Sequence, residues 1–198
     1  RLEHKVRIVL YEDLNMDYMF KDIKSLMSVE MISTKDCKIT SMISTFENCE
    51  YLQSFNIKGF NGEKIKSLHK LFYNSGLITF SSQFNFTNNV EDMSYMFAFT
   101  SIQTILFSDL NTEKVTNMSH MFDSCMGLYL VDTNNNLDTS NVKDMSYMFH
   151  SCEAMSELDL SNFNTIQVKD MSHMFQDCIS LSQLIISNFD TKNVKDII

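Results

Sequence analysis

The 198-residue chain contains no proline and only four glycines, the residues that most often make turns. Its turns must therefore be built by Asn, Asp, Ser and Thr, whose short side chains bond back to the local backbone. The scarcity of glycine also excludes the glycine-rich loops that cradle phosphate groups. Neither GxSxG nor HExxH occurs, so the usual signatures of a serine hydrolase and of a zinc peptidase are absent.

Long apolar runs and clustered cations are also missing. No stretch of about 18 apolar residues occurs, so the sequence predicts no membrane-spanning helix and no direct membrane insertion. The segment VRIVLY at 6–11 is too short for a secretion signal, although a chain that begins with Arg1 is expected to be a processed product or a fragment. The net charge of −9 and the scattered Lys and Arg argue against nucleic acid as a partner.

A phenylalanine recurs along the chain at a nearly constant period of 26, 26, 25, 25, 27 and 26 residues. A fixed period between about 20 and 50 residues is the signature of a solenoid, whose stacked units share one core. No linker interrupts the repeat, so we predict one repeat domain over 1–198, with a capping strand in 1–14 and repeats over 15–198, the last incomplete. The recurring residues, expected to form one core column, are Phe20, Phe46, Phe72, Phe97, Phe122, Phe149 and Phe175.

The first half of each repeat carries a helical pattern. In the copy that begins at Asn141, the apolar residues Val142, Met145, Met148 and Phe149 lie at i, i+3, i+6 and i+7, which is one face of a short helix. Asn141 is a suitable N-terminal cap for that helix. The sequence therefore predicts a short helix here and in the other copies.

The second half of each repeat alternates with period two, which predicts a strand of three to five residues. The expected fold class is an α/β solenoid of about seven units of about 26 residues, each strand–turn–short helix, with a parallel β-sheet on one face. Helix axes that stay about 8–10 Å apart would fan the array into a curve, whereas shorter 3₁₀ turns would leave a straighter rod. The predicted strands include Leu158-Asp159-Leu160, Leu184-Ile185-Ile186, Ile105-Leu106-Phe107 and Phe55-Asn56-Ile57.

The repeat resembles that of a known family. MFHSCEAMSELDLSNFNT at 148–165 is similar to the MFxxCxxLxxLDLSxFDT repeat of BspA-like leucine-rich-repeat surface proteins. The likeness is strong over residues 90–198 and weak over 14–89. It implies a leucine-rich-repeat-like solenoid at the cell surface or in the extracellular medium, often linked to adhesion, and it implies no enzyme. The chain departs from the family pattern near Ser75-Gly76 and Thr100-Ser101 and by an additional Asn in 134–136, so the strand register is expected to change locally at these places.

Four cysteines share one repeat position, three residues after the phenylalanine. A zinc site typically contains a C-x₂₋₄-C pair, and none occurs, because the nearest two cysteines are twelve residues apart. We therefore expect no metal and no cofactor, and we expect buried thiols that fill a narrow slot, with disulfides between successive rungs as the alternative. The four residues are Cys49, Cys125, Cys152 and Cys178.

Two histidines and a row of strand residues are the remaining candidates for chemistry. His120 and His173 alternate with tyrosines in one slot, two repeats and about 10 Å apart by strand spacing, so they are predicted to lie on a solvated face and not to share a metal ion. On the strand face, Asp132 and Asp159 occupy adjacent rungs, and two neighbouring carboxylates are the arrangement that a glycosidase uses. The same slot elsewhere holds other residue types, which favours a binding surface formed by Asn56, Leu106, Asp132, Glu157, Asp159 and Ile185, or a merely solvated strand face.

These features favour a non-enzymatic module that binds a protein or a glycan through its strand face. The segment NVKDII at 193–198 matches the start of an earlier repeat, so we expect either further repeats or docking on another subunit at that end. The alternative function is therefore a structural subunit or spacer that assembles through the open repeat near Ile198. An enzyme is the least favoured class.

Overall fold

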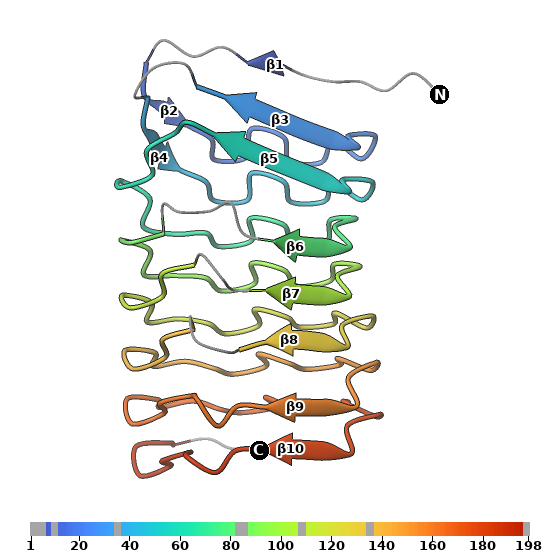
Figure 1. The fold of residues 1–198 in the computed structure, drawn as a ribbon, viewed down its shortest axis with the longest axis vertical. Helices are drawn as coiled ribbons and strands as arrows, with labels where there is room; N and C mark the ends of the chain where they lie inside the picture. The colour runs from blue at the N-terminus through green and yellow to red at the C-terminus, as the bar shows by residue number, and fades with distance from the viewer. Residues whose placement is uncertain are drawn as a thin grey trace.

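The computed structural model of the chain is a parallel β-solenoid of about six turns, whose rungs stack along the long axis (Figure 1). It describes residues 7–8, 12–33, 37–81, 87–106, 110–133 and 137–195. Phe107, the Asn run at 134–136 and Ile198 lie outside the described residues. The strands are β1 (Arg7–Ile8), β2 (Leu14–Asn15), β3 (Ser28–Ile32), β4 (Ile39–Ser41), β5 (Ser54–Lys58), β6 (Thr79–Ser81), β7 (Thr104–Leu106), β8 (Leu130–Asp132), β9 (Glu157–Asp159) and β10 (Gln183–Ile185).

The strands of one face pair in parallel, as predicted, but in three separate ladders. The ladders are β1-β3-β5, β6-β7-β8 and β9-β10, which follow one another along the long axis (Figure 1). The breaks lie beside two of the three irregular places, since β6 follows Ser75-Gly76 and β8 precedes the Asn run, whereas β6 and β7 stay paired across Thr100-Ser101. A Cβ on Gly76 would collide with the carbonyl oxygen of Glu50, so the rungs pass closely at this point and require glycine.

The predicted short helices are wrong, because the described residues contain no helix. In the segment that was expected to be helical, the N–H groups of Tyr147 and Phe149 donate to the carbonyl oxygens of Ser172 and Met174 in the next rung, at 2.9 and 3.0 Å. These bonds hold successive turn segments at the spacing of paired strands, about 4.8 Å, where helix axes, which need about 8–10 Å, cannot fit. The array is therefore an all-β solenoid of about six turns and not an α/β array of about seven helix-containing units.

The turn segment reaches this spacing by alternating the handedness of its backbone. Tyr147 and Ser151 have φ of 56° and 54°, and the same two positions have positive φ in every turn segment from Tyr18 to Asp177. Left-handed backbone costs an L residue about 1–2 kcal/mol, and here it aims the N–H groups at the next rung. The alternation also brings a side chain inward every third or fourth residue, which is the spacing of a helix face and the reason the sequence predicted one.

The Asp and Ser of an Asp-Met-Ser motif, which recurs at 144–146 and 170–172, shape the approach to the turn segment. The Oδ1 atom of Asp144 accepts hydrogen bonds from the backbone N–H and the hydroxyl group of Ser146, at 2.9 and 2.7 Å. Asp170 and Ser172 repeat both bonds one rung further on. This local turn needs no glycine or proline, which explains how a chain almost free of both can turn so often. The motif is therefore a structural unit that the chain stacks.

The seven repeat phenylalanines form one stacked column inside the solenoid. Successive ring centroids lie 5.4–6.1 Å apart, with interplanar angles of 16° or less. The rings from Phe46 to Phe149 are fully buried, whereas Phe175 is partly exposed. Methionines and leucines surround the column and complete one continuous core. Burial of these side chains is the main source of stability that a stacked array offers.

Replacing Phe122 with Ala should destabilise the protein by about 3–5 kcal/mol, because the change removes a fully buried ring and leaves a cavity between two rungs. The free energy of unfolding in urea measures the loss. Phe99→Ala is the matched control, since Phe99 is 46% exposed and its loss should cost less than about 1 kcal/mol. Equal losses for the two variants would contradict the continuous core.

Candidate functional site

The strand face carries most of the residues that the sequence suggested for binding. Leu106 pairs with Asp132 across β7 and β8, and Ile185 pairs with Asp159 across β10 and β9. These four side chains occupy equivalent positions in their rungs. Glu157 lies two residues before Asp159 and points to the same exposed side.

Asn56 fits this surface less well than the other candidates. It occupies the equivalent position in β5, opposite Glu30 of β3, but in a separate ladder. Its side chain is partly buried, and its Oδ1 atom has no hydrogen-bond partner among the described residues. Ile185 and Asp132 are also partly buried, and β9 belongs to a different ladder from β7 and β8. The exposed side chains of this surface lie on or beside β7, β8 and β9 and are Leu106, Tyr129, Leu130, Glu157 and Asp159.

Two exposed apolar side chains that the sequence analysis did not single out also belong to this surface. Leu130 and Tyr129 are 47% and 53% exposed, and Leu106 nearby is 41% exposed. The alternation of outward- and inward-facing residues in Leu130-Val131-Asp132 is the sequence signal from which Leu130 could have been predicted to face solvent. Apolar side chains of this size that cluster in solvent are typical of interaction surfaces.

The charge on the strand face is predominantly acidic. The strands from β3 to β10 carry one basic side chain, Lys58, on the exposed side. The Oδ1 atom of Asp159 accepts a hydrogen bond from the N–H of Ser161 at 2.8 Å, and hydrogen bonds from this serine lower the pKa of Asp159. The carboxylate is therefore charged at neutral pH. The acidic residues of these strands are Glu30, Asp132, Glu157 and Asp159.

A ladder of aromatic rings runs along the turn side of the rungs. Tyr95 stacks on His120 with centroids 4.2 Å apart, and His120 stacks on Tyr147 at 4.5 Å. His173 lies on the other side of Tyr147, also at 4.5 Å. The two histidines are half-buried on an outer face, on opposite sides of one tyrosine ring, so they do not approach a common ion.

Asp123 forms a buried acid–histidine cluster that the sequence reading missed. Its Oδ2 and Oδ1 atoms accept hydrogen bonds from Nδ1 of His120 at 2.8 Å and from Nδ1 of His150 at 2.7 Å. Burial raises the pKa of Asp123 and is the largest single influence, but hydrogen bonds from His120, His150 and Ser124 outweigh it, so this pKa lies below its ordinary value. Asp123 and His150 share one repeat position, directly after the repeat phenylalanine, whereas His120 lies two residues before it, so alignment of the repeats could have placed Asp123 next to His150 but not His120 beside both.

Three of the four thiols of the cysteine slot, Cys49, Cys125 and Cys152, are buried as predicted, whereas Cys178 is partly exposed. All five cysteines of the chain are free. The Sγ atoms of Cys125 and Cys152 donate to the carbonyl oxygens of Phe97 and Phe122 in the preceding rung, at 3.1 and 3.3 Å. Burial raises the pKa of Cys125 to about 12 and also raises that of Cys152, which leaves neither thiol nucleophilic at neutral pH.

Ser75 occupies the same slot without making the same bond. It is 3% exposed, and its hydroxyl group has no partner among the described residues. A buried hydroxyl group without a partner costs about 1–3 kcal/mol. The slot therefore suits a thiol better than a hydroxyl group in this rung.

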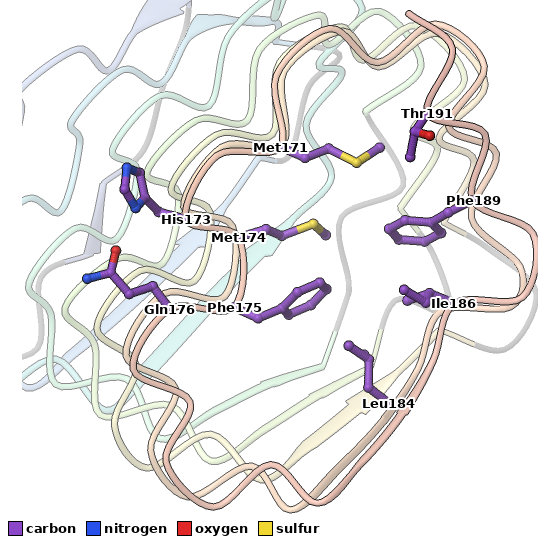
Figure 2. Close-up of a pocket in the computed structure, with 9 residues that line it drawn as sticks. All are labelled: Met171, His173, Met174, Phe175, Gln176, Leu184, Ile186, Phe189 and Thr191. Carbon is purple, nitrogen blue, oxygen red and sulfur yellow. The ribbon is translucent and has the colours of Figure 1, made fainter. Parts of the chain in front are cut away.

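The outward side of the last described rung contains an apolar hollow of about 640 Å³. In Figure 2, side chains from the turn segment and from the strand side point toward one another across it, while His173 and Gln176 point away. The hollow is the continuation of the core, left uncovered because no described rung follows. Its apolar lining consists of Met171, Met174, Phe175, Leu184, Ile186 and Phe189.

The described part of the chain provides no metal centre, since no group of three or more His, Cys, Asp or Glu side chains there is arranged to hold an ion. No helix in the same residues is long and apolar enough to cross a membrane.

The family model described as "Mycoplasma protein of unknown function, DUF285" matches residues 13–105 and 98–198. The chain belongs to this family. The match and the solenoid are compatible with a BspA-like repeat surface protein. Comparisons with curated proteins and with solved structures gave no match.

Replacing Asp123 with Asn should lower the free energy of unfolding by about 2 kcal/mol at neutral pH, because a charge-assisted bond to each histidine is lost. Folding lowers the pKa of Asp123, so its stabilising effect is complete above the unfolded value of about 4 and disappears as the pH falls through the lower folded value. Urea unfolding at several pH values measures the difference between the two proteins.

Asp177→Asn is the matched control for this cluster. The Asp177 carboxylate is exposed and lies 3.6 Å from Nε2 of His150, so its loss should cost less than about 1 kcal/mol. If Asp123→Asn costs no more than Asp177→Asn at neutral pH, the cluster does not stabilise the fold.

Replacing Ser75 with Cys should raise the free energy of unfolding by about 1 kcal/mol, because the change removes a buried hydroxyl group that lacks a partner. The thermal midpoint and the urea midpoint both report this gain. Ser101→Cys is the control, since Ser101 is exposed and its replacement should change neither midpoint. A loss of stability at position 75 would show that this rung cannot accommodate sulfur.

Proposed function

We propose that this chain is a non-enzymatic interaction module that binds a ligand through the exposed strand face of β7, β8 and β9. The supporting observation is the group of exposed apolar side chains, Leu106, Tyr129 and Leu130, beside an acidic row. Apolar area favours a protein ligand over a glycan, and the carboxylates favour a basic one. The proposed ligand is therefore a protein segment that presents Lys or Arg beside apolar residues.

The likeness to BspA-like repeats supports a location at the cell surface or outside the cell, with a role in adhesion. In particular, this likeness supports the interpretation of the MFxxC repeat as a repeat of the BspA-like family. This step rests on family resemblance and on no feature of the binding face itself.

A second function, as a structural subunit of a larger assembly, is favoured by the apolar hollow on the last described rung. Repeat arrays normally cover such a continuation of the core, and a rung of another subunit is one way to cover it. The two functions use different surfaces and do not exclude one another.

The strand-face proposal is tested by measuring how much of the protein binds to an immobilised array of short peptides and to an immobilised array of glycans. The chain should retain peptides that combine basic and apolar residues, and replacing both Asp132 and Asp159 with Lys should reduce that retention at least about tenfold, because the sign of the face is reversed. Glu63→Lys with Glu113→Lys is the charge-matched control on exposed positions outside the strands. Equal retention by both double variants would overturn the face assignment.

A further inference from the structure

Lysines that are scattered along the sequence form a row on the solenoid. Lys143, Lys169 and Lys195 follow one another at intervals of 26 residues, which is one repeat, and each side chain is exposed. The backbone N–H of Lys169 donates to the carbonyl oxygen of Lys143, and that of Lys195 donates to Lys169, both at 2.8 Å. The three lysines therefore occupy one column on successive rungs, about 4.8 Å apart.

This lysine row lacks the anionic partner that the same column has in earlier rungs. Lys66 and Glu91 stand in the column before it and form an ion pair of 2.8 Å. Lys143, Lys169 and Lys195 form no ion pair with any residue that the structure describes. Like charges on neighbouring rungs repel one another, and a ligand with negative charges at the same spacing would remove this repulsion.

A row of amide side chains runs beside the lysines. The residues two positions before the lysines are Asn141, Gln167 and Asn193, and all three are exposed, whereas Val142 and Val168 between the two rows face the core. The amide nitrogens of Asn141 and Asn193 donate to carbonyl oxygens of the preceding rung at 2.7 Å, which holds these two side chains in place. Ammonium and amide groups on one face can bind the carboxylates and the hydroxyl groups of a single ligand.

Two acidic side chains adjoin this face and limit the strength of binding. Asp144 and Asp170 follow Lys143 and Lys169 directly, are half-buried, and each accept a hydrogen bond from a serine two residues later. They reduce the local positive potential, so the face suits a ligand that makes several weak contacts at once. Binding of this kind weakens as salt is added, because exposed ion pairs are screened.

We propose that this face binds an acidic polysaccharide that carries one carboxylate on each sugar residue and lies along the long axis of the solenoid. Pyranose rings linked across the ring advance a chain by a distance similar to one rung, so successive carboxylates reach successive lysines. The sugar hydroxyl groups then bond to the amide row. The face uses residues other than those of the strand face, so the inference adds a second ligand to the proposed function.

Other polyanions fit the two rows less well. B-DNA carries one phosphate charge per about 1.7 Å of its axis, which is much denser than the lysines. A polyphosphate chain has no hydroxyl groups for the amide row. An anionic membrane surface attracts dense clusters of cations, whereas this chain has three lysines in one row and a net charge of −9.

Titration calorimetry of the intact chain with short polygalacturonate oligomers at low ionic strength tests the lysine row. The triple variant Lys143→Gln, Lys169→Gln and Lys195→Gln should bind at least about tenfold more weakly, because three ion pairs with the ligand are lost. Its urea midpoint should not fall, since the substitutions are on exposed side chains and remove like charges. Methyl-esterified oligomers, which lack the carboxylate charge, should not bind.

The charge-matched control is the triple variant Lys24→Gln, Lys64→Gln and Lys66→Gln. These lysines are exposed and are already engaged in ion pairs with carboxylates of the chain, at 2.6, 3.0 and 2.8 Å. This variant has the same net charge as the first and should bind polygalacturonate as tightly as the unchanged chain. Equal affinities of the two triple variants, or no binding by the unchanged chain, would overturn the proposal.

Gln167→Ala separates recognition of a sugar acid from attraction of any anion. The side chain is exposed, so the change should leave the urea midpoint unchanged. It should weaken binding of polygalacturonate about threefold through a lost hydrogen bond, and it should not alter the weak binding of polyphosphate. Tighter binding of polyphosphate or of phosphatidylglycerol vesicles than of polygalacturonate would overturn the assignment to a sugar acid.

Discussion

Hydrogen bonds between successive turn segments are the constraint on which the rest of this solenoid depends. They fix the distance between successive rungs on the side away from the strands, so this distance is the same on the turn side and on the strand side of the solenoid. A helix on that side would have separated the rungs and curved the array. The left-handed residues that the segment requires are strained individually, and the repeated inter-rung bonds offset that strain.

Fixed spacing makes every side chain a neighbour of its counterparts in the rungs above and below. Apolar positions gain from this, since phenylalanine stacks on phenylalanine and thiols reach the carbonyl oxygens of the preceding rung. Polar positions are less uniform. The outer column alternates tyrosine and histidine from Tyr95 to His173, and Asp123 lies between two histidines, whereas Asp144 and Asp170 occupy one column in adjacent rungs.

The sequence alone predicted the repeat period, the phenylalanine column and the position of the strands, because these features follow from which side chains face the core. It was misleading about the helices, since Met145, Met148 and Phe149 face inward at the same intervals in a helix and in the alternating turn. It did not indicate the Asp123 cluster as a whole, because His120 occupies a different repeat position from Asp123 and His150, which share one. The outward row of Leu106, Asp132 and Asp159 followed from simple alternation, and the ladder breaks lie beside repeat irregularities that are visible in the sequence.

Alternate N–H groups of each turn segment, such as those of Tyr147 and Phe149, point toward the next rung, and this shared direction has an electrical consequence. The dipoles of those peptide groups add along the rod instead of cancelling, as strand dipoles largely do. In an α-helix the positive end of the summed dipole lies at the N-terminus, whereas here it lies on the side of the highest-numbered rung. A long stack of such rungs is thus a polarised rod, whose field distinguishes its two ends at a distance from any contact.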